Sequence, residues 1–270
     1  MSEAILGVIG GGVMGEALLS RLLDQSIFEP QAVVVSDPSA DRRSYLYDTY
    51  GINAVDDNEV VVQQATVVLL AVKPQILSKV ATQLKDTIST VRPLLLSILA
   101  GTTLNQLTDC FVGWPVIRAM PNTPATVGAG VTALARGEDV SDQHLEQARQ
   151  IFASVGDVVV VSEPLMDAVT ALSGSGPGYV ALVVEALADG GVAAGLPRAA
   201  AMQLAIQTVK GTAELLQQSG MHPGALKDRV TSPGGTTIAG VAQLEAGGLR
   251  SALIEAVRAA CARAKELGQG

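Results

Sequence analysis

The chain has few cysteines, few histidines, few aromatic side chains and no excess of positive charge. Two cysteines, Cys110 and Cys261, in 270 residues cannot form a disulfide framework or a cysteine-rich metal cluster, so we expect a reducing compartment, the cytoplasm. A net charge of −8 and an aromatic content of 3% argue against a nucleic-acid partner, which requires basic side chains and rings for stacking. The first residues have the pattern of a strand without a basic segment or cleavage site, and predict no export signal.

The two histidines exclude a further class of enzyme. His144 falls in a predicted surface helix, and His222 precedes Pro223 at a predicted helix start. Neither has a carboxylate beside it in sequence, so the His–Asp pair of the hydroxy-acid dehydrogenases is not evident. The spacing of the potential ligands predicts no metal site.

The N-terminal segment carries the plainest signal that is present, an apolar run that breaks into glycines and continues as an apolar helix. Gly10, Gly12 and Gly15 have the dinucleotide spacing G-x-G-x-x-G. Gly10 permits the turn, Gly12 lets the backbone approach a pyrophosphate, and Gly15 lets the helix pack on the strand. The alternative is a purely structural glycine turn. The flanking strand and helix, and a second strand that ends in Asp37, favour nucleotide binding.

Strands and helices alternate through the first part of the chain. Strands are predicted at residues 32–36, 67–72, 94–99, 115–118, 131–135 and 157–161, and helices at 41–50, 75–84 and 142–152, the last with Ser141 as N-cap. This order predicts a Rossmann-like, doubly wound parallel sheet. We place a boundary near Ser162, with residues 1–162 as a dinucleotide-binding domain and 163–270 as a helical domain.

The second part of the chain is predicted to be all helical. The helices are expected at residues 164–172, 178–194, 198–218, 223–229, 235–245 and 249–267, with Pro197 at a helix start and Gly195, Gly220 and Gly247 at helix ends. The helices at 178–194 and 249–267 are too apolar to be covered within so small a domain, so we expect a second copy to pack on them. The run 176–196 contains Glu185 and Asp189 and predicts a buried helix rather than a membrane span.

Polar residues follow the predicted strands, where ligands of open α/β sheets bind. The candidate cofactor residues there are Ser36, Asp37, Pro38, Asn58, Ala71, Val72, Lys73, Pro74 and Ala100. Each of these residues, taken by itself, is equally well explained as a residue that ends a strand or starts a loop, or as a charge exposed to solvent. Asp37 lies where a carboxylate binds the ribose of NADH, whereas Arg42 and Arg43 are close enough in sequence to bind the 2′-phosphate of NADPH. This pattern leaves the choice of nucleotide open.

A glycine-rich turn in the helical half, residues 232–237, precedes a predicted helix. The backbone N–H groups of Gly235 and Thr236 and the hydroxyl of Ser232 would form a small cradle for a carboxylate, and Thr237 would add a hydroxyl. A turn that only starts a helix is the alternative. No strong base is evident nearby, which suits an imine, because an iminium carbon accepts hydride with little acid–base help.

Five segments together resemble the pyrroline-5-carboxylate reductases. They are residues 9–15 (IGGGVMG), 71–75 (AVKPQ), 120–124 (MPNTP), 167–177 (DAVTALSGSGP) and 231–237 (TSPGGTT). The resemblance implies reduction of 1-pyrroline-5-carboxylate to L-proline, the final step of proline synthesis, with NADPH preferred and NADH as the alternative. It also implies an N-terminal Rossmann domain and a C-terminal helical domain that forms homodimers, often assembled into decamers.

The resemblance also implies roles for individual residues. Thr237 would hydrogen-bond the ring nitrogen of the substrate, Ser232, Gly235 and Thr236 would hold its carboxylate, and Glu163 would be an acid near the substrate pocket. The cofactor would contact Gly10, Gly11, Gly12, Val13 and Met14 together with the residues after the strands. Two residues depart from the family pattern. Val13 replaces a polar residue, commonly Asn, and Leu99 replaces a small one, which weakens the prediction of tight cofactor contacts.

Two other classes remain as alternatives. A β-hydroxyacid dehydrogenase has this architecture but requires a catalytic lysine with an asparagine one helical turn on, and here Lys210 is followed by Glu214. A non-catalytic nucleotide-sensing protein would not need the turn at 232–237. We therefore expect a small-molecule substrate, no nucleic acid, no membrane, and a homodimer or higher homo-oligomer.

Overall fold

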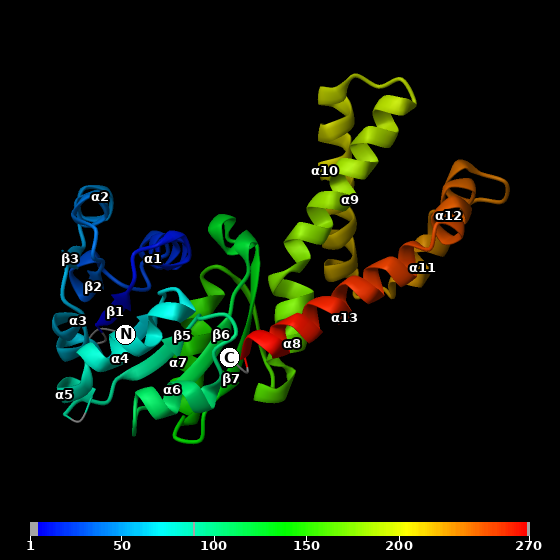
Figure 1. Ribbon diagram of the computed structural model, residues 1–270. Helices are drawn as coiled ribbons and strands as arrows, with labels where there is room; N and C mark the ends of the chain where they lie inside the picture. The colour runs from blue at the N-terminus through cyan, green and yellow to red at the C-terminus, as the bar shows by residue number, and fades with distance from the viewer. Residues whose placement is uncertain (1–4, 89, 269–270) are drawn as a thin grey trace. The chain divides into compact units, whose positions relative to one another are not determined.

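The computed structural model describes residues 5–88 and 90–268 and divides the chain into two compact units (Figure 1). The first unit comprises Met1–Gly174 with Ala260–Gly270, and the second Ser175–Ala259. The predicted functional boundary near Ser162 stays a prediction, whereas the packing of the chain divides at Gly174. The reason is that Met166 is fully buried in the core of the first unit, which keeps the segment after Ser162 with the sheet.

An eight-stranded sheet forms the centre of the first unit. Its strands are β1 (Leu6–Ile9), β2 (Val33–Ser36), β3 (Asn53–Val55), β4 (Val67–Leu70), β5 (Leu94–Ser97), β6 (Val116–Met120), β7 (Gly130–Arg136) and β8 (Gly156–Val160). Their order is β3-β2-β1-β4-β5-β6-β7-β8. The chain moves outward from β1 in both directions, so the switch point of this doubly wound sheet lies between β1 and β4.

The predicted doubly wound parallel sheet is confirmed, except that its last two strands run antiparallel to the rest. The strands from β3 to β6 are parallel to one another, but β7 is antiparallel to β6, and β8 is parallel to β7. The connection between β6 and β7 spans only residues 121–129. A parallel return needs a crossover of about a dozen residues or more, so this short connection returns the chain antiparallel.

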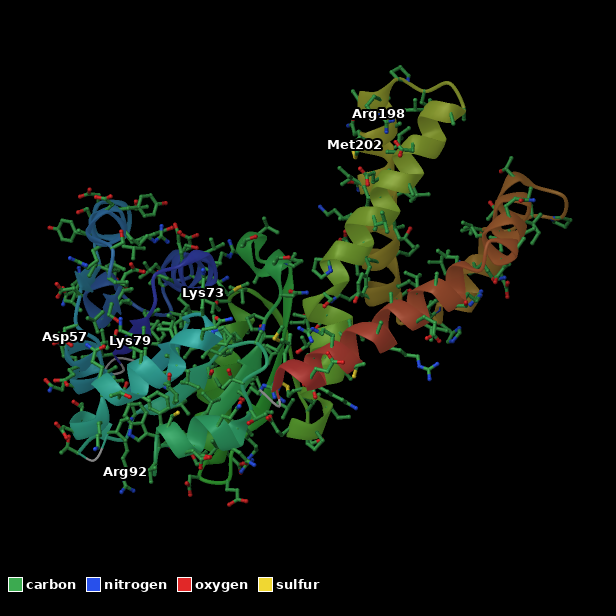
Figure 2. All side chains as sticks on the ribbon, viewed as in Figure 1. Asp57, Lys73, Lys79, Arg92, Arg198 and Met202 are labelled. Carbon is green, nitrogen blue, oxygen red and sulfur yellow. The ribbon has the colours of Figure 1, made fainter. Side chains whose placement is uncertain are left out.

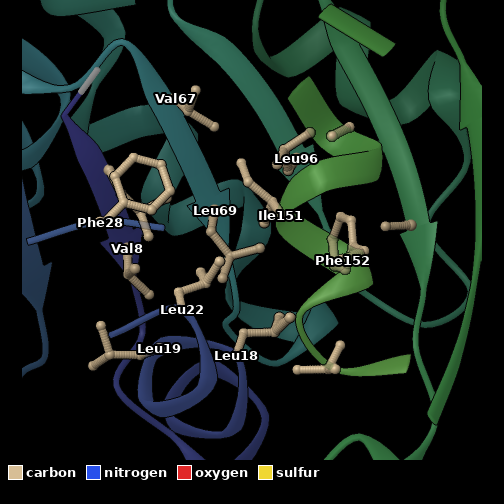
Figure 3. Close-up of a cluster of buried hydrophobic side chains, with 14 of the residues drawn as sticks. Val8, Leu18, Leu19, Leu22, Phe28, Val67, Leu69, Leu96, Ile151 and Phe152 are labelled. Atoms are coloured by element: carbon tan, nitrogen blue, oxygen red, sulfur yellow. The ribbon is translucent and has the colours of Figure 1, made fainter. Parts of the chain in front are cut away.

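Both faces of the sheet are buried, which explains the uninterrupted apolar runs of the central strands. Val8, Val67, Leu69 and Leu96 face α1 and α7, whose Leu18 and Phe152 reach into the same cluster (Figure 3). The alternate residues of the same strands face α3, α4 and α6. Helices therefore cover both faces and leave the strand ends to form a site.

The helices of the first unit differ in places from the predicted ones. They are α1 (Val13–Asp24), α2 (Ala40–Tyr50), α3 (Asn58–Gln64), α4 (Leu77–Gln83), α5 (Lys85–Ile88), α6 (Leu104–Cys110), α7 (Asp142–Ala153) and α8 (Met166–Val169). Ser141 caps α7 as predicted, its Oγ accepting from the N–H of His144 at 3.1 Å. The helix expected at 164–172 is instead a 3₁₀ turn at Glu163–Leu165, then α8, then a π-helical turn at Thr170–Gly174. Strand β3 and helices α3, α5 and α6 were not predicted.

The second unit is helical, as expected. It contains α9 (Gly176–Ala193), α10 (Arg198–Ser219), α11 (Pro223–Arg229), α12 (Thr236–Ala246) and most of α13 (Leu249–Gly268). Gly195 and Gly220 follow α9 and α10 with positive φ, of 101° and 62°. Gly247 is the C-cap of α12, at the helix end as expected, with a right-handed helical conformation, and the next residue, Gly248, has a positive φ of 74°.

The second unit has a very small core of its own. Helices α9 and α10 form a hairpin (Figure 1) whose buried contacts come from Ala188, Ala201 and Ala205. Large apolar side chains on these helices stay exposed in the single chain, with Leu182 67% and Leu204 57% exposed. Such faces need a partner to cover them.

One helical stretch among the described residues, Glu163–Ala193, has the length and the apolar composition of a membrane span, with a mean hydropathy of 1.2. The core helix of a soluble protein has the same length and composition. Only 11% of the most apolar 18-residue window in this stretch is buried in the single chain, so the buried helix that the sequence predicted is not formed within one copy.

Candidate active site

The glycine loop connects β1 to α1 with the geometry that the spacing predicted. Gly10 has a φ of 102°, which side-chain-bearing residues rarely adopt. A Cβ on Gly15 would lie 2.5 Å from the carbonyl oxygen of Gly10, so only glycine lets the helix pack this closely. A Cβ on Gly12 would meet no atom of the described residues within 4 Å, which leaves open space above the loop.

Helix α1 begins at this open space without a side-chain cap. Its N-cap is Gly12, whose carbonyl accepts the first helical hydrogen bond, from the N–H of Glu16 at 2.8 Å. The N–H groups of the first helical turn therefore have no acceptor within the helix. Together with the helix dipole they form a site suited to an anion such as a pyrophosphate. Val13, the departure from the family pattern, is 77% exposed at this start.

A carboxylate network supports the loop from α2. Glu16 accepts hydrogen bonds from Arg42, from Tyr45 at 3.0 Å and from Tyr50 at 2.9 Å. Burial by itself raises the pKa of Glu16, but the hydrogen bonds from Arg42 and the two tyrosines outweigh it and leave that pKa below its ordinary value of 4.5. Arg42 also donates to the carbonyl of Gly11 at 2.5 Å. The sequence did not predict this network, and its one signal there is an acid, Glu16, in the first turn of α1.

The residues after β2 and β3 lie together at the same edge of the sheet. Ser36 ends β2, and its hydroxyl donates to Oδ1 of Asn58 at 2.6 Å. Asn58 begins α3 three residues after the end of β3, so it too lies beyond a strand end, although β3 was not predicted. The structure thus brings Ser36 and Asn58 into contact across residues far apart in sequence.

Asp37 and the two arginines considered for the ribose have different partners. The carboxylate of Asp37 accepts from the N–H of Gly11 at 3.1 Å and of Ser39 at 2.9 Å. Arg42 is engaged by the glycine loop and Glu16. Arg43 instead donates from Nη1 to the carbonyl oxygens of Asp37 and Pro38, at 2.8 and 3.1 Å. Of the two arginines, Arg43 is therefore the one held on the loop after β2.

The residues after β4 and β5 continue the same edge on the other side of the switch point. Ala71, Val72, Lys73 and Pro74 follow β4, with the N–H of Ala71 donating to Ile9 at 2.9 Å, and Figure 2 labels Lys73 on the first unit. Ala100 follows β5 and lines an open cavity of about 570 Å³ that also contacts Pro74 and Gly101. The second departure, Leu99, is buried in the core, so its larger side chain is accommodated by packing.

The turn at residues 232–237 has the local structure of a second anion site. Gly234 has a φ of 64°, Gly235 is the N-cap of α12 without a side-chain cap, and the first helical bond runs from Ala239 to Gly235 at 3.3 Å. The N–H of Gly235 donates to the carbonyl of Ser232 at 3.0 Å, so it is not free for a ligand as the sequence analysis expected. The N–H groups of the first turn of α12, beginning with Thr236, have no acceptor within the helix.

Thr237 lies in this first turn and is half-buried. Other helical threonines return their hydroxyl to the carbonyl four residues earlier, as Thr170 does to Met166 at 2.9 Å and Thr212 to Thr208 at 2.7 Å. For Thr237 no such bond is found among the described residues, because α12 begins only one residue before it. Its hydroxyl is therefore available for a ligand.

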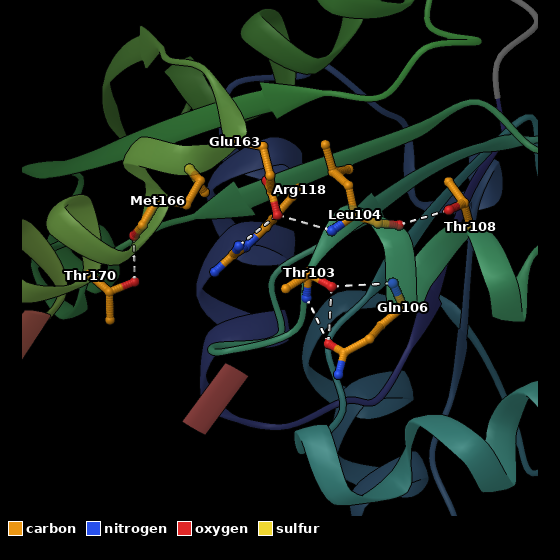
Figure 4. Close-up of polar contacts among 8 residues, drawn as sticks. All are labelled: Thr103, Leu104, Gln106, Thr108, Arg118, Glu163, Met166 and Thr170. Atoms are coloured by element: carbon orange, nitrogen blue, oxygen red, sulfur yellow. Dashed lines mark hydrogen bonds and ion pairs between the residues drawn. The ribbon is translucent and has the colours of Figure 1, made fainter. Parts of the chain in front are cut away.

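Glu163 lies at the start of the segment that follows β8. Its Oε1 accepts from Nη1 of Arg118 at 2.8 Å and from the N–H of Leu104 at 3.0 Å (Figure 4). Its Oε2 is buried without a hydrogen-bond partner in the part of the chain that the structure describes. The pair borders a cavity of about 300 Å³ that also contacts Asp167 and Lys265. Sequence reasoning missed Arg118, a lone charge in an apolar strand.

The first unit thus brings the predicted cofactor residues to one edge of the sheet, while Ser232, Gly235, Thr236 and Thr237 form a separate turn in the second unit. The described residues fit a dinucleotide, since the open space above Gly12 and the uncapped start of α1 accept a pyrophosphate that a Cβ would exclude.

Comparisons with known proteins identify the family. Residues 5–101 match the family model "NADP oxidoreductase coenzyme F420-dependent", and residues 163–267 match "Pyrroline-5-carboxylate reductase dimerisation". A pyrroline-5-carboxylate reductase of Synechocystis sp. is 56% identical over 264 residues, which cover 98% of each chain. The chain belongs to the pyrroline-5-carboxylate reductase family.

Solved structures of the family have the same fold. A pyrroline-5-carboxylate reductase of Coxiella burnetii superposes with a TM-score of 0.93 at 36% identity, covering 98% of each chain. A pyrroline carboxylate reductase of Plasmodium falciparum, determined with NADP bound, has a TM-score of 0.88 at 32% identity, covering 99% of each chain. These matches confirm the predicted resemblance and the Rossmann-like fold with a helical dimerisation domain.

Pyrroline-5-carboxylate reductases catalyse the final step of proline biosynthesis, and this member of the family is an NADP-dependent oxidoreductase with a small-molecule substrate. The dimerisation domain makes the protein a homo-oligomer, which accounts for the exposed apolar faces of the second unit. The two alternatives, a β-hydroxyacid dehydrogenase and a nucleotide-sensing protein, are thereby excluded.

Proposed function

We propose that the enzyme binds NADPH at the start of α1 and holds the carboxylate of 1-pyrroline-5-carboxylate at the start of α12. The observation that carries this proposal is the pair of helices that begin at an uncapped glycine, Gly12 and Gly235. Each helix start presents backbone N–H groups without a helix acceptor, so each suits an anion. The cofactor has a pyrophosphate and the substrate has a carboxylate.

The cofactor side of the proposal rests on the strand ends of the first unit. The contacts are assigned to Gly10, Gly11, Gly12, Val13, Met14, Ser36, Asp37, Pro38, Asn58, Ala71, Val72, Lys73, Pro74 and Ala100. When bound, the dihydronicotinamide supplies a hydride for the imine carbon C5 of the substrate. The residues of the chain hold the two molecules in position, and we assign most of the rate enhancement to this positioning.

The substrate side rests on the turn at residues 232–237. The N–H of Thr236 and the hydroxyl of Ser232 bind the carboxylate. Gly235 leaves room for that hydroxyl, since a Cβ on Gly235 would lie 2.3 Å from Oγ of Ser232. The Thr237 hydroxyl hydrogen-bonds the ring nitrogen. In the iminium form the nitrogen already carries the proton of the product amine, so hydride addition to C5 completes the reduction to L-proline.

Glu163 is assigned as an acid near the substrate pocket. Its Oε2, without a partner among the described residues, supports this assignment because a buried carboxylate oxygen favours a hydrogen-bond donor. The dimerisation match begins at residue 163, which supports the functional division into residues 1–162 and 163–270.

We further propose a cytoplasmic enzyme whose helical units form a homodimer, with assembly of dimers into a decamer. The apolar faces of α9 and α10 then pack against a second copy rather than a membrane. Arg198, labelled in Figure 2, forms an exposed ion pair with Asp189, with atoms 2.5 Å apart, and the charges that this pair places on both helices argue against a lipid environment. The net charge of −8 supports the absence of a nucleic-acid partner.

Replacement of Thr237 by Val tests the assignment. The variant keeps the shape of the side chain and removes its hydroxyl, so we expect kcat with 1-pyrroline-5-carboxylate to fall by roughly 100-fold while the Kd of NADPH stays within about twofold. The measurements are NADPH absorbance for the rate and fluorescence titration for the Kd.

The matched control is Thr212→Val, which removes a hydroxyl that is bonded to Thr208 within α10. This variant should retain wild-type kcat. A Thr237→Val variant with unchanged kcat would remove Thr237 from the mechanism, and a parallel loss of NADPH binding would assign it to folding instead.

A further inference from the structure

We propose that Asn122 is a positioning residue for the reduction, because it fastens the π-helical turn at Thr170–Gly174 to the cofactor edge of the sheet. Asn122 lies just after β6, is only 9% exposed, and is absent from the set of residues assigned to cofactor or substrate. The proposal rests on the proposed function, since the cofactor edge matters to the rate only if the nicotinamide binds there.

The side chain of Asn122 bridges two backbone segments. Its Nδ2 donates to the carbonyl oxygen of Ser173 at 3.2 Å, and its Oδ1 accepts from the N–H of Val131 in β7 at 3.0 Å. A carbonyl can only accept and a backbone N–H can only donate, so this arrangement requires an amide side chain in one orientation. The uncharged amide of Asn122 supplies both the donor and the acceptor.

Asn122 and its two hydrogen bonds, to Ser173 and Val131, form a clamp. This clamp lies at the edge of the sheet that carries the cofactor residues. Strand β6 is parallel to β5, so both strands end at the same edge, β5 before Ala100 and β6 before Asn122. The contact is close, because a Cβ on Gly174 would lie 2.7 Å from Cε of Met120, the last residue of β6. The π-helical turn is thus packed against the end of β6 as well as hydrogen-bonded to Asn122.

The clamped turn is also the last part of the first unit, since the second unit begins at Ser175. π-Helical turns are rare and are frequent at functional sites. The chain that later forms the Ser232 to Thr237 turn leaves the first unit after Gly174, one residue beyond the Ser173 carbonyl that Asn122 holds. A shift of about 1 Å in a supporting group costs up to 100-fold in rate when catalysis depends on positioning.

The variant Asn122→Asp keeps one of the two hydrogen bonds of Asn122 and removes the other. The carboxylate still accepts from Val131, but at neutral pH its second oxygen has no proton to donate to Ser173. We expect kcat per NADPH-binding site to fall at least about tenfold, with the Kd of NADPH within twofold of wild type. Hydrogen–deuterium exchange should rise at the amides of residues 170–174 and stay unchanged in β7.

The pH profile provides a readout that a purely structural role would not change. A buried carboxyl beside a carbonyl has a raised pKa, and its protonated form donates the missing hydrogen bond. The kcat of Asn122→Asp relative to wild type should therefore rise as the pH falls from about 8 to about 6. Asn122→Ala, which loses both bonds, should show a loss at least as large without this recovery, and it serves as the second variant if the Asp variant does not fold.

Asn105→Asp, the same substitution at an exposed position on α6, is the matched control and should behave as wild type. Wild-type kcat per site in either folded Asn122 variant would overturn the proposal, as would a loss of NADPH binding in step with the loss of rate. A wild-type enzyme that does not reduce 1-pyrroline-5-carboxylate would instead overturn the proposed function, and the exchange measurement reports on the clamp in either case.

Discussion

The guanidinium of Arg118 and the carboxylate of Glu163 form an ion pair, with Nη1 and Oε1 2.8 Å apart (Figure 4). The Arg118 side chain is 4% exposed, and that of Glu163 is 27% exposed. The same oxygen of Glu163 accepts from the N–H of Leu104 at the start of α6. One carboxylate therefore joins β6, α6 and the segment that follows β8.

Removing one member of this pair should destabilise the first unit. Arg118→Met leaves the carboxylate of Glu163 partly buried without its cation, and we expect the free energy of unfolding to fall by about 3 kcal/mol. Urea unfolding followed by the fluorescence of Trp114, the single tryptophan of the chain, measures this. The double variant Arg118→Met with Glu163→Met should recover part of the loss. A double variant that loses the sum of both single effects would contradict a direct pairing.

The glycines of the loop should separate stability from cofactor binding. In Gly15→Ala the new Cβ meets the backbone oxygen of Gly10, which cannot move aside, so the unfolding free energy should fall by about 2 kcal/mol. In Gly12→Ala the Cβ enters open space, so the loss should stay below about 1 kcal/mol. The Kd of NADPH should nevertheless rise at least about tenfold for Gly12→Ala, because the methyl group occupies the position of the pyrophosphate. An unchanged Kd would place the cofactor elsewhere.

The lowered pKa of Glu16 predicts a dependence of stability on pH. A carboxyl group whose folded pKa lies below its unfolded value of 4.5 stabilises the fold above that pH, and the contribution is lost as the pH falls through the folded pKa. The difference in unfolding free energy between wild type and Glu16→Gln should therefore be constant near pH 7 and shrink below pH 4.5. Exposed Glu29→Gln is the control, and its difference from wild type should remain near zero throughout. A difference that grows on acidification would reverse the sign of the effect.

Arg43 should contribute to the preference for NADPH over NADH. Its guanidinium is held on the carbonyl oxygens of Asp37 and Pro38, on the loop after β2 where the adenosine ribose of a dinucleotide lies. Arg43→Ala should raise the Kd of NADPH about tenfold and that of NADH less than twofold, because only NADPH carries the 2′-phosphate. Lys210→Ala, which removes a charge in α10 of the second unit, is the control. Equal effects of Arg43→Ala on both nucleotides would contradict this role.

Local patterns in the sequence predicted the glycine loop, the apolar strands and the long helices. Periodicity failed where an element was short or polar, as in β3 and α3, and Asn58 was therefore not recognised as following a strand. The antiparallel return to β7 was missed because strand direction depends on the length of the connection, which apolar patterning does not report. The turn at residues 232–237 stays a proposed substrate site, and its residue types did not predict that the Gly235 N–H is bonded to the Ser232 carbonyl.

The amino-acid sequence alone determined which backbone conformations are allowed. It thereby determined the dinucleotide loop, the two uncapped helix starts and the family resemblance. These depend on glycine spacing and apolar periodicity, which act over a few residues. Tertiary structure alone decided which polar groups have partners. Asn122 bonds to Ser173, Arg118 to Glu163, and Arg42 rather than Arg43 to Glu16, because such contacts join residues tens of positions apart that only the packed sheet brings within hydrogen-bond distance.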